Sequence, residues 1–128
     1  MEKLMDGVKN ADEFTIPGGG VVPTAILVGV TPLFVERVKE LKDGEGQPCA
    51  GLYVPQEGKI KLDWGMPASY EQVTLAHELI HALLAQAGLG DMFGNLLEPL
   101  CDALGNSLPM LLRDNPALRD YLATPLQS

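Results

Sequence analysis

The sequence predicts an α+β fold in which a small antiparallel sheet packs on a central helix and a second helix follows. Three observations support this prediction. Short segments rich in β-branched residues occupy the region from 21 to 64, and a long apolar helix is expected over 69–87. A second segment with helical spacing begins near Asn95. Strands that come before helices in this way are typical of an α+β domain.

The length and composition fit one domain with one core, since 46% of the 128 residues are apolar. Residues 1–20 are mostly polar and end in three glycines, which have too much backbone freedom for the interior of a helix or strand. We therefore expect a loosely ordered N-terminal segment over 1–20 and the domain itself over 21–128. No internal repeat is evident.

The charge and the apolar runs exclude several classes of partner. A net charge of −8 argues against nucleic acid, because phosphate binding needs a basic surface. The apolar run 25–30 is too short to span a membrane, and the first seven residues contain no secretory signal. Two cysteines do not make a disulfide framework. We expect a cytoplasmic protein with no membrane contact, and the sequence leaves the oligomeric state unknown.

The region before the long helix contains four candidate strand segments. Residues 25–30 form a β-branched run, and 50–54 form a second strand. Residues 34–41 fit either a helix or a strand, because their apolar residues match both spacings. Residues 59–64 alternate strictly, and the turn before them, at Gly58, predicts a hairpin with the preceding strand. The apolar face of the last strand consists of Ile60, Leu62 and Trp64, and should pack on the following helix.

The long helix has recognisable start and stop signals. Ser69 and Gln72 have the spacing of a capping box, with Ser69 as the N-cap residue. Gly88 and Gly90 are typical of a helix C-terminus. The segment is apolar nearly all round, which predicts that the helix is central rather than peripheral.

The remaining sequence predicts two further helices. The first begins near Asn95 and tolerates Pro99 in its first turn, whereas Pro109 is expected to kink or restart it. Asn115 and Pro116 fit the N-cap and first position of a short last helix that ends at residue 122.

The most specific chemical signal is His77-Glu78-Leu79-Ile80-His81, which reads H-E-x-x-H and contains both histidines of the chain. Residues four apart on a helix lie one turn above each other on the same face. His77 and His81 can therefore bind one metal ion. Glu78 projects beside them, within reach of a proton on a metal-bound water.

A third ligand is expected downstream, because a catalytic zinc normally has three protein ligands and one open position. No third histidine exists, which excludes the zinc peptidases whose third ligand is histidine. Glu98, seventeen residues after His81, is the best candidate, and Asp102 and Asp91 are its rivals. A different interpretation makes Glu98 a capping-box carboxylate paired with Asn95.

Glu98 and Asp102 read E-x-x-x-D, and together with H-E-x-x-H this pattern resembles the gluzincin branch of zinc peptidases. The resemblance implies that Glu98 is the third zinc ligand and that Asp102 orients His77. A further resemblance rests on residues 74–82 and 111–116. These look like the small zincin-like metallopeptidase domains of phages and prophages, which are distantly similar to repressor-cleaving regulatory metallopeptidases. This second resemblance implies a minimal zincin-like fold. It also implies that the protein works in the cytoplasm of a bacterial cell or of a phage-infected host.

The expected function is zinc-dependent hydrolysis of a peptide bond in a protein or peptide substrate. Zn²⁺ would activate a water, and Glu78 would serve as general base and then protonate the leaving amine. Tyr70, two turns before His77 on the same helix face, is a candidate for stabilising the oxyanion, and Tyr121 is another. By resemblance, the strand 59–64 would bind extended substrate by edge pairing.

Two alternatives stay open. The chain can be a zincin-fold, zinc-binding protein without peptidase activity, in which Asp102 or Cys101 closes the fourth metal position. It can also serve as a structural or interaction module of a phage or prophage.

Overall fold

The structure is a computed structural model and describes residues 22–125; the segment 1–20, expected to be loosely ordered, lies outside the described residues. The α+β class is confirmed, with a four-stranded sheet and three helices. The strands are β1 (Ala25–Val28), β2 (Thr31–Val38), β3 (Gly51–Val54) and β4 (Lys59–Asp63). The helices are α1 (Ala68–Gln86), α2 (Leu97–Asp114) and α3 (Pro116–Leu122), and short 3₁₀ turns are η2 (Pro55–Glu57) and η3 (Gly94–Leu96).

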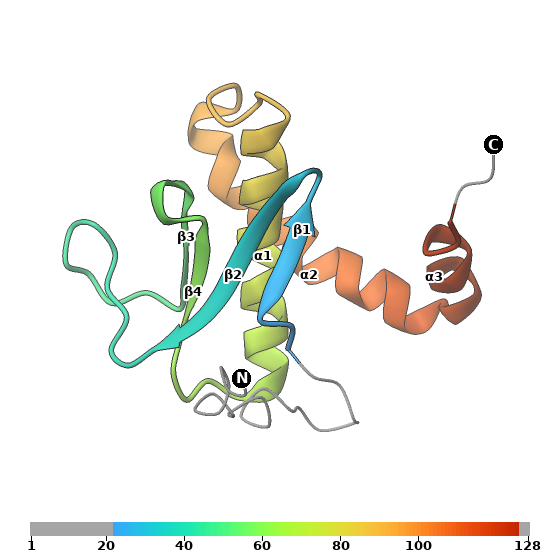
Figure 1. The fold of residues 1–128 in the computed structure, drawn as a ribbon, viewed down its shortest axis with the longest axis horizontal. Helices are drawn as coiled ribbons and strands as arrows, with labels where there is room; N and C mark the ends of the chain where they lie inside the picture. The colour runs from blue at the N-terminus through green and yellow to red at the C-terminus, as the bar shows by residue number, and fades with distance from the viewer. Residues whose placement is uncertain (1–21, 126–128) are drawn as a thin grey trace.

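The sheet has the strand order β1-β2-β4-β3 (Figure 1). β3 and β4 form the predicted antiparallel hairpin, and β1 pairs with β2 in the same sense. The central pair, β2 with β4, is parallel, so the expectation of a wholly antiparallel sheet is wrong. The chain crosses from β2 to the far edge, forms β3 there, and returns through the hairpin to the centre. The ambiguous segment 34–41 is a strand as far as Val38.

The core lies between the sheet and α1. Ile60 and Leu62 on β4 are fully buried, as their alternation predicts. Trp64 does not complete this apolar face: it follows the end of β4 in a turn and is 43% exposed. The guanidinium of Arg37 lies 5.9 Å from the centre of the Trp64 ring, so this indole covers a charged group instead.

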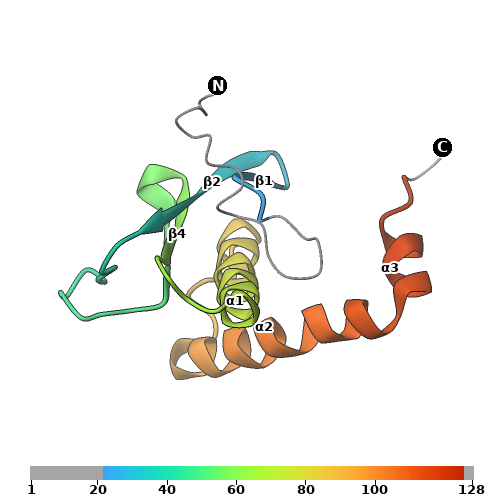
Figure 2. The same cartoon turned by 90° about the horizontal axis from the view of Figure 1, so that it is seen from below.

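Helix α1 forms the middle of three layers, with the sheet on one side and α2 on the other (Figure 2). A helix covered on two sides needs apolar residues around most of its circumference, which explains its composition. Helix α3 packs against the far end of α2, and this end projects away from the sheet (Figure 1). No helix within residues 22–125 has the length and apolarity to cross a membrane.

The start of α1 differs from the predicted capping box. The helix begins at Ala68, Pro67 is the N-cap residue, and no side chain caps the helix. The carbonyl of Pro67 accepts the N–H of Glu71 instead, at 2.9 Å. Arg37 on β2 donates two hydrogen bonds, of 2.8 and 2.9 Å, to the buried carboxylate of Glu71. An ion pair therefore ties the first turn of α1 to the sheet, but it caps none of the helix N–H groups.

The ends of the helices are closer to expectation. Gly88 adopts a φ of +78° directly after α1, in agreement with its predicted role at the C-terminus. Helix α2 runs without interruption through Pro109, so of the two expected outcomes the restart is wrong, and the kink stays a prediction; the proline removes one backbone donor but does not end the helix. Helix α3 begins at Pro116 after Asn115, as predicted.

Candidate metal centre

His77 and His81 lie in the middle of α1, on the side that faces α2. Their ring centroids are 5.0 Å apart, as expected for residues one helical turn apart. Their side chains are 15% and 17% exposed, so both rings are largely held by packing. Each directs its Nε2 atom toward the same carboxylate on α2.

That carboxylate belongs to Glu98, in the first turn of α2. Its Oε1 lies 3.1 Å from Nε2 of His77, and its Oε2 lies 2.8 Å from Nε2 of His81. Four ligands about 2.0–2.1 Å from a tetrahedral metal ion lie roughly 3.3 Å from one another. The ligand atoms of the three residues all lie within 4.8 Å, so this group can hold a metal ion. Asp91, the rival candidate, is exposed in the α1–α2 connection and is not part of the group.

Asp102 lies on the other side of the His77 ring. Its Oδ1 is 2.8 Å from Nδ1 of His77, the ring nitrogen that does not face Glu98. A carboxylate at this distance can accept the Nδ1–H, an arrangement that orients a histidine ligand and turns its Nε2 toward a metal ion. Two acidic residues one turn apart on α2 therefore hold both nitrogens of one ring. Glu98 belongs to the group of residues that can hold a metal ion, whereas its rival Asp102 does not.

Glu78 projects from α1 beside the histidines and is 8% exposed. Its Oε2 lies 3.9 Å from Nε2 of His77, and the backbone N–H of Tyr53 on β3 donates to its carboxylate. Burial raises the pKa of Glu78 above its ordinary value; His77, His81 and the Tyr53 hydrogen bond oppose this effect, and the charge of Glu98 adds to it. A carboxylate with a raised pKa is a stronger base than an exposed glutamate.

Two glycines, which no sequence pattern assigned to the site, allow the close packing around these side chains. A Cβ on Gly51 of β3 would lie 2.6 Å from Cγ2 of Thr74 and 3.1 Å from Cγ of Glu78. A Cβ on Gly105 of α2 would lie 3.0 Å from the backbone of His77. The available signal was weak: Gly105 is an unexplained glycine inside a helix, where glycine costs about 1 kcal/mol.

The sheet edge beside the centre is β3, which is the last strand in the order and lies against α1. The expectation that the strand 59–64 binds substrate by edge pairing is therefore wrong. β4 pairs with β2 on one side and β3 on the other, so its backbone groups are already used. In the hairpin, β3 is the edge strand and β4 is internal. The alternation of apolar residues within each strand does not predict which of the two lies at the edge.

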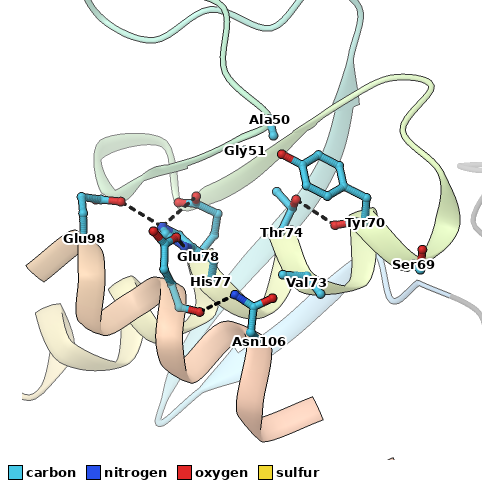
Figure 3. A pocket seen from close by; sticks show the side chains of 11 residues that line it. Ala50, Gly51, Ser69, Tyr70, Val73, Thr74, His77, Glu78, Glu98 and Asn106 are labelled. Atoms are coloured by element: carbon cyan, nitrogen blue, oxygen red, sulfur yellow. Dashed lines mark hydrogen bonds and ion pairs between the residues drawn. The ribbon is translucent and has the colours of Figure 1, made fainter. Parts of the chain in front are cut away.

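A cavity of about 570 Å³ opens beside the centre, between α1, α2 and the start of β3 (Figure 3). Tyr70 lines it, and its ring extends toward Ala50 (Figure 3). The other candidate, Tyr121, lies on α3 and does not line this cavity. Asn106 of α2 also lines it, a residue that the sequence did not single out, and its amide donates to the Asp102 carbonyl at 2.8 Å.

Within residues 22–125, no fourth side chain joins the ligand group. Cys101, a candidate for closing the site, comes between Glu98 and Asp102 in the sequence of α2. Its side chain is fully buried, and it is not a member of the ligand group. Burial, with the neighbouring acidic groups, raises the pKa of its thiol and keeps it protonated. Three ligands and one open position are typical of catalytic metal sites.

Comparisons with known proteins do not bear on this geometry: no protein family, no curated protein and no solved structure matches the chain.

Proposed function

We propose that this chain is a zinc-dependent peptidase of the gluzincin type. The observation that carries the proposal is the position of Glu98, whose two oxygens reach Nε2 of both His77 and His81. Two imidazole nitrogens and one carboxylate oxygen are a ligand set of catalytic zinc sites. Asp102 on the far nitrogen of His77, and the buried Glu78 beside the ligands, support the same assignment.

The chemistry divides between the ion and Glu78. Zinc held by the three ligands would lower the pKa of a bound water and polarise the substrate carbonyl. Glu78 accepts the proton as the water oxygen bonds to the carbonyl carbon, and then delivers it to the leaving nitrogen as the C–N bond breaks. The products are a carboxylic acid and an amine. The Tyr53 N–H holds the Glu78 carboxylate in place for both transfers.

The edge of β3 supplies a site for the substrate backbone. The Ala50 carbonyl accepts the N–H of Asp63, so positions 50, 52 and 54 bond toward β4 in the alternating antiparallel ladder. Gly51 and Tyr53 therefore direct their backbone groups to the open side. The Tyr53 N–H already donates to Glu78. The backbone N–H and carbonyl of Gly51 are therefore the groups that would pair with an extended peptide added to the sheet.

The oxyanion of the tetrahedral intermediate needs a hydrogen-bond donor in addition to the ion. Tyr70 and Asn106 line the cavity from α1 and α2, and both carry donor groups. We assign Tyr70 the role of stabiliser, because its phenolic hydroxyl is a donor and its side chain lines the cavity. Its side chain is 54% exposed, so core packing does not fix it in place.

The replacement Glu78→Gln tests the proposal. The zinc-loaded variant is expected to keep its zinc, because Glu78 is not a ligand, and to hydrolyse a mixed peptide library at least about 100-fold more slowly. Glu45→Gln, the same change in an exposed loop, should leave zinc content and hydrolysis unchanged. Loss of zinc from Glu78→Gln, or undiminished hydrolysis, would refute the assigned role.

A further inference from the structure

A second cavity, of about 470 Å³, lies next to the metal cavity and shares two of its lining residues, Ala50 and Tyr70. We call it the loop cavity, because residues 40–50 form one of its walls. Its apolar lining consists of Leu41, Pro48, Cys49, Ala50, Met66 and Tyr70. A concave, mostly apolar space of this size is typical of a ligand-binding pocket.

The loop that forms the wall is tied down by backbone hydrogen bonds, so the cavity is formed before any ligand arrives. The N–H of Cys49 donates to the Leu41 carbonyl at 3.1 Å, and the N–H of Leu41 donates to Oδ1 of Asp63 on β4 at 2.8 Å. Oδ1 of Asp43 accepts two further N–H groups within the loop. Glu40, on the same wall, has a φ of +54°, which an L-residue adopts only when its surroundings impose it.

The chemistry of the lining favours an apolar side chain. Asp63, one of the two carboxylates that line the cavity, already accepts a hydrogen bond from the Leu41 N–H. Burial, with the nearby charges of Asp43, Glu78 and Asp63, raises the pKa of Cys49, so its thiol is uncharged. The charged residues of the lining are two carboxylates, Glu40 and Asp63, and one cation, Lys42, so a negatively charged ligand would meet a net negative charge. An apolar side chain would lose no hydrogen bond on entry.

The distance from the metal ligands fits a peptide that crosses Tyr70. Tyr70 precedes His77 by seven residues, or about 10 Å along a helix. An extended peptide advances about 3.3 Å per residue. A peptide side chain that reaches the loop cavity past Tyr70 therefore belongs to a residue roughly three positions from the peptide bond that lies at the metal site. Ala50, directly before the open Gly51 backbone pair, continues the same path along β3.

We infer that the loop cavity is a specificity-determining subsite that receives an apolar side chain of the same extended peptide, about three residues from the cleaved bond. The inference rests on the proposed peptidase function for its substrate, and it adds the residue class that selects the substrate. Cys49 and Met66 are the side chains that set the depth and width of the subsite.

The first experiment profiles cleavage by the zinc-loaded full chain on a peptide library randomised around its centre, with mass spectrometry of the products. Wild type should prefer Leu, Met or Phe over Asp and Glu at one fixed position by roughly tenfold or more. Cys49→Phe should shift that preference to Ala and Gly, and Cys49→Ala, which adds no atoms, should shift it to larger apolar residues. Gln47→Phe, in the same loop but outside the cavity lining, should keep the wild-type profile. An absent preference, or an unchanged one in both Cys49 variants, overturns the inference.

The second experiment separates this inference from the proposed hydrolysis. Zinc-loaded Glu78→Gln protein, with and without the additional substitution Cys49→Phe, is immobilised, and the peptides that each protein retains from the library are sequenced. Retention of apolar peptides that depends on residue 49, without cleavage by wild type, would refute hydrolysis and leave the subsite standing. Cleavage without dependence on residue 49 would refute the subsite alone. If the library shows no selective retention and wild type cleaves none of its peptides, both the subsite and the proposed hydrolysis are refuted.

Discussion

Gly105 on α2 lies directly against the backbone of His77 on α1, and a Cβ at position 105 would be 3.0 Å from both Cα and N of His77. Glu98, Asp102 and Gly105 follow one another at spacings of four and three residues and share one face of α2. The glycine therefore sets how closely this face approaches α1. The two carboxylates, on the same face, reach the imidazole because the helices meet at this contact.

Gly105→Ala should destabilise the protein and weaken metal binding. An alanine in a helix interior ordinarily stabilises it by about 1 kcal/mol relative to glycine. Here the added methyl meets backbone atoms that cannot move aside, and overpacking of this kind costs about 1–3 kcal/mol. Urea unfolding of the metal-free protein and zinc titration measure the two effects. Ser107→Ala, a change on an exposed position of the same helix, is the control and should leave zinc affinity unchanged.

Glu98→Ala should lower zinc occupancy at limiting zinc by at least about tenfold, because it removes one of three ligands. Elemental analysis of the dialysed protein measures the occupancy. Asp91→Ala removes the rival carboxylate from the α1–α2 connection and should leave occupancy unchanged. Full occupancy in Glu98→Ala would move the third ligand to another residue.

Asp102→Asn should weaken zinc binding by roughly 10–100-fold without abolishing it, as expected when a histidine ligand loses its orienting carboxylate. The 2.8 Å contact between Oδ1 and Nδ1 of His77 is the basis of this expectation. Competition with a chelator of known affinity gives the measurement, and Asp114→Asn near the end of α2 is the matched control. An affinity equal to that of wild type would show that the contact does not orient the ring.

Glu78→Gln should make the metal-free protein more stable at pH 8. Because the pKa of Glu78 is raised in the folded state, the folded protein binds more protons than the unfolded chain between the two pKa values. Wild-type stability therefore falls as pH rises through this window and stays lowered above it. Glutamine does not titrate, so the advantage of the variant should shrink below the ordinary pKa of 4.5. Unfolding by urea in the presence of a chelator, at pH 4 and pH 8, tests the sign; equal differences at both would contradict it.

The sequence predicted the features that depend on local spacing. His77 and His81 share a face because a helix repeats every 3.6 residues, and Ile60 and Leu62 share one because a strand repeats every two. The same local signals located the β3–β4 hairpin and the start of α3.

Features that depend on distant contacts were missed. The pairing of β4 with two neighbours, and the first turn of α1 with its link from Arg37 to Glu71, involve residues far apart in the chain. Glycine signals freedom in a sequence, and nothing local distinguishes Gly105 as a contact point from a helix-weakening residue. Pro109 costs one backbone hydrogen bond, and the helix on either side of it outweighs that loss.

We propose that His77, His81 and Glu98 hold a zinc ion with one position open to water. X-ray absorption at the zinc edge, on protein loaded with one equivalent of zinc, is the decisive measurement. We expect four nitrogen or oxygen neighbours at about 2.0–2.1 Å, with the scattering pattern of two imidazoles and no sulfur. A neighbour at about 2.3 Å, the zinc–sulfur distance, would show that a cysteine closes the site and would contradict the claim.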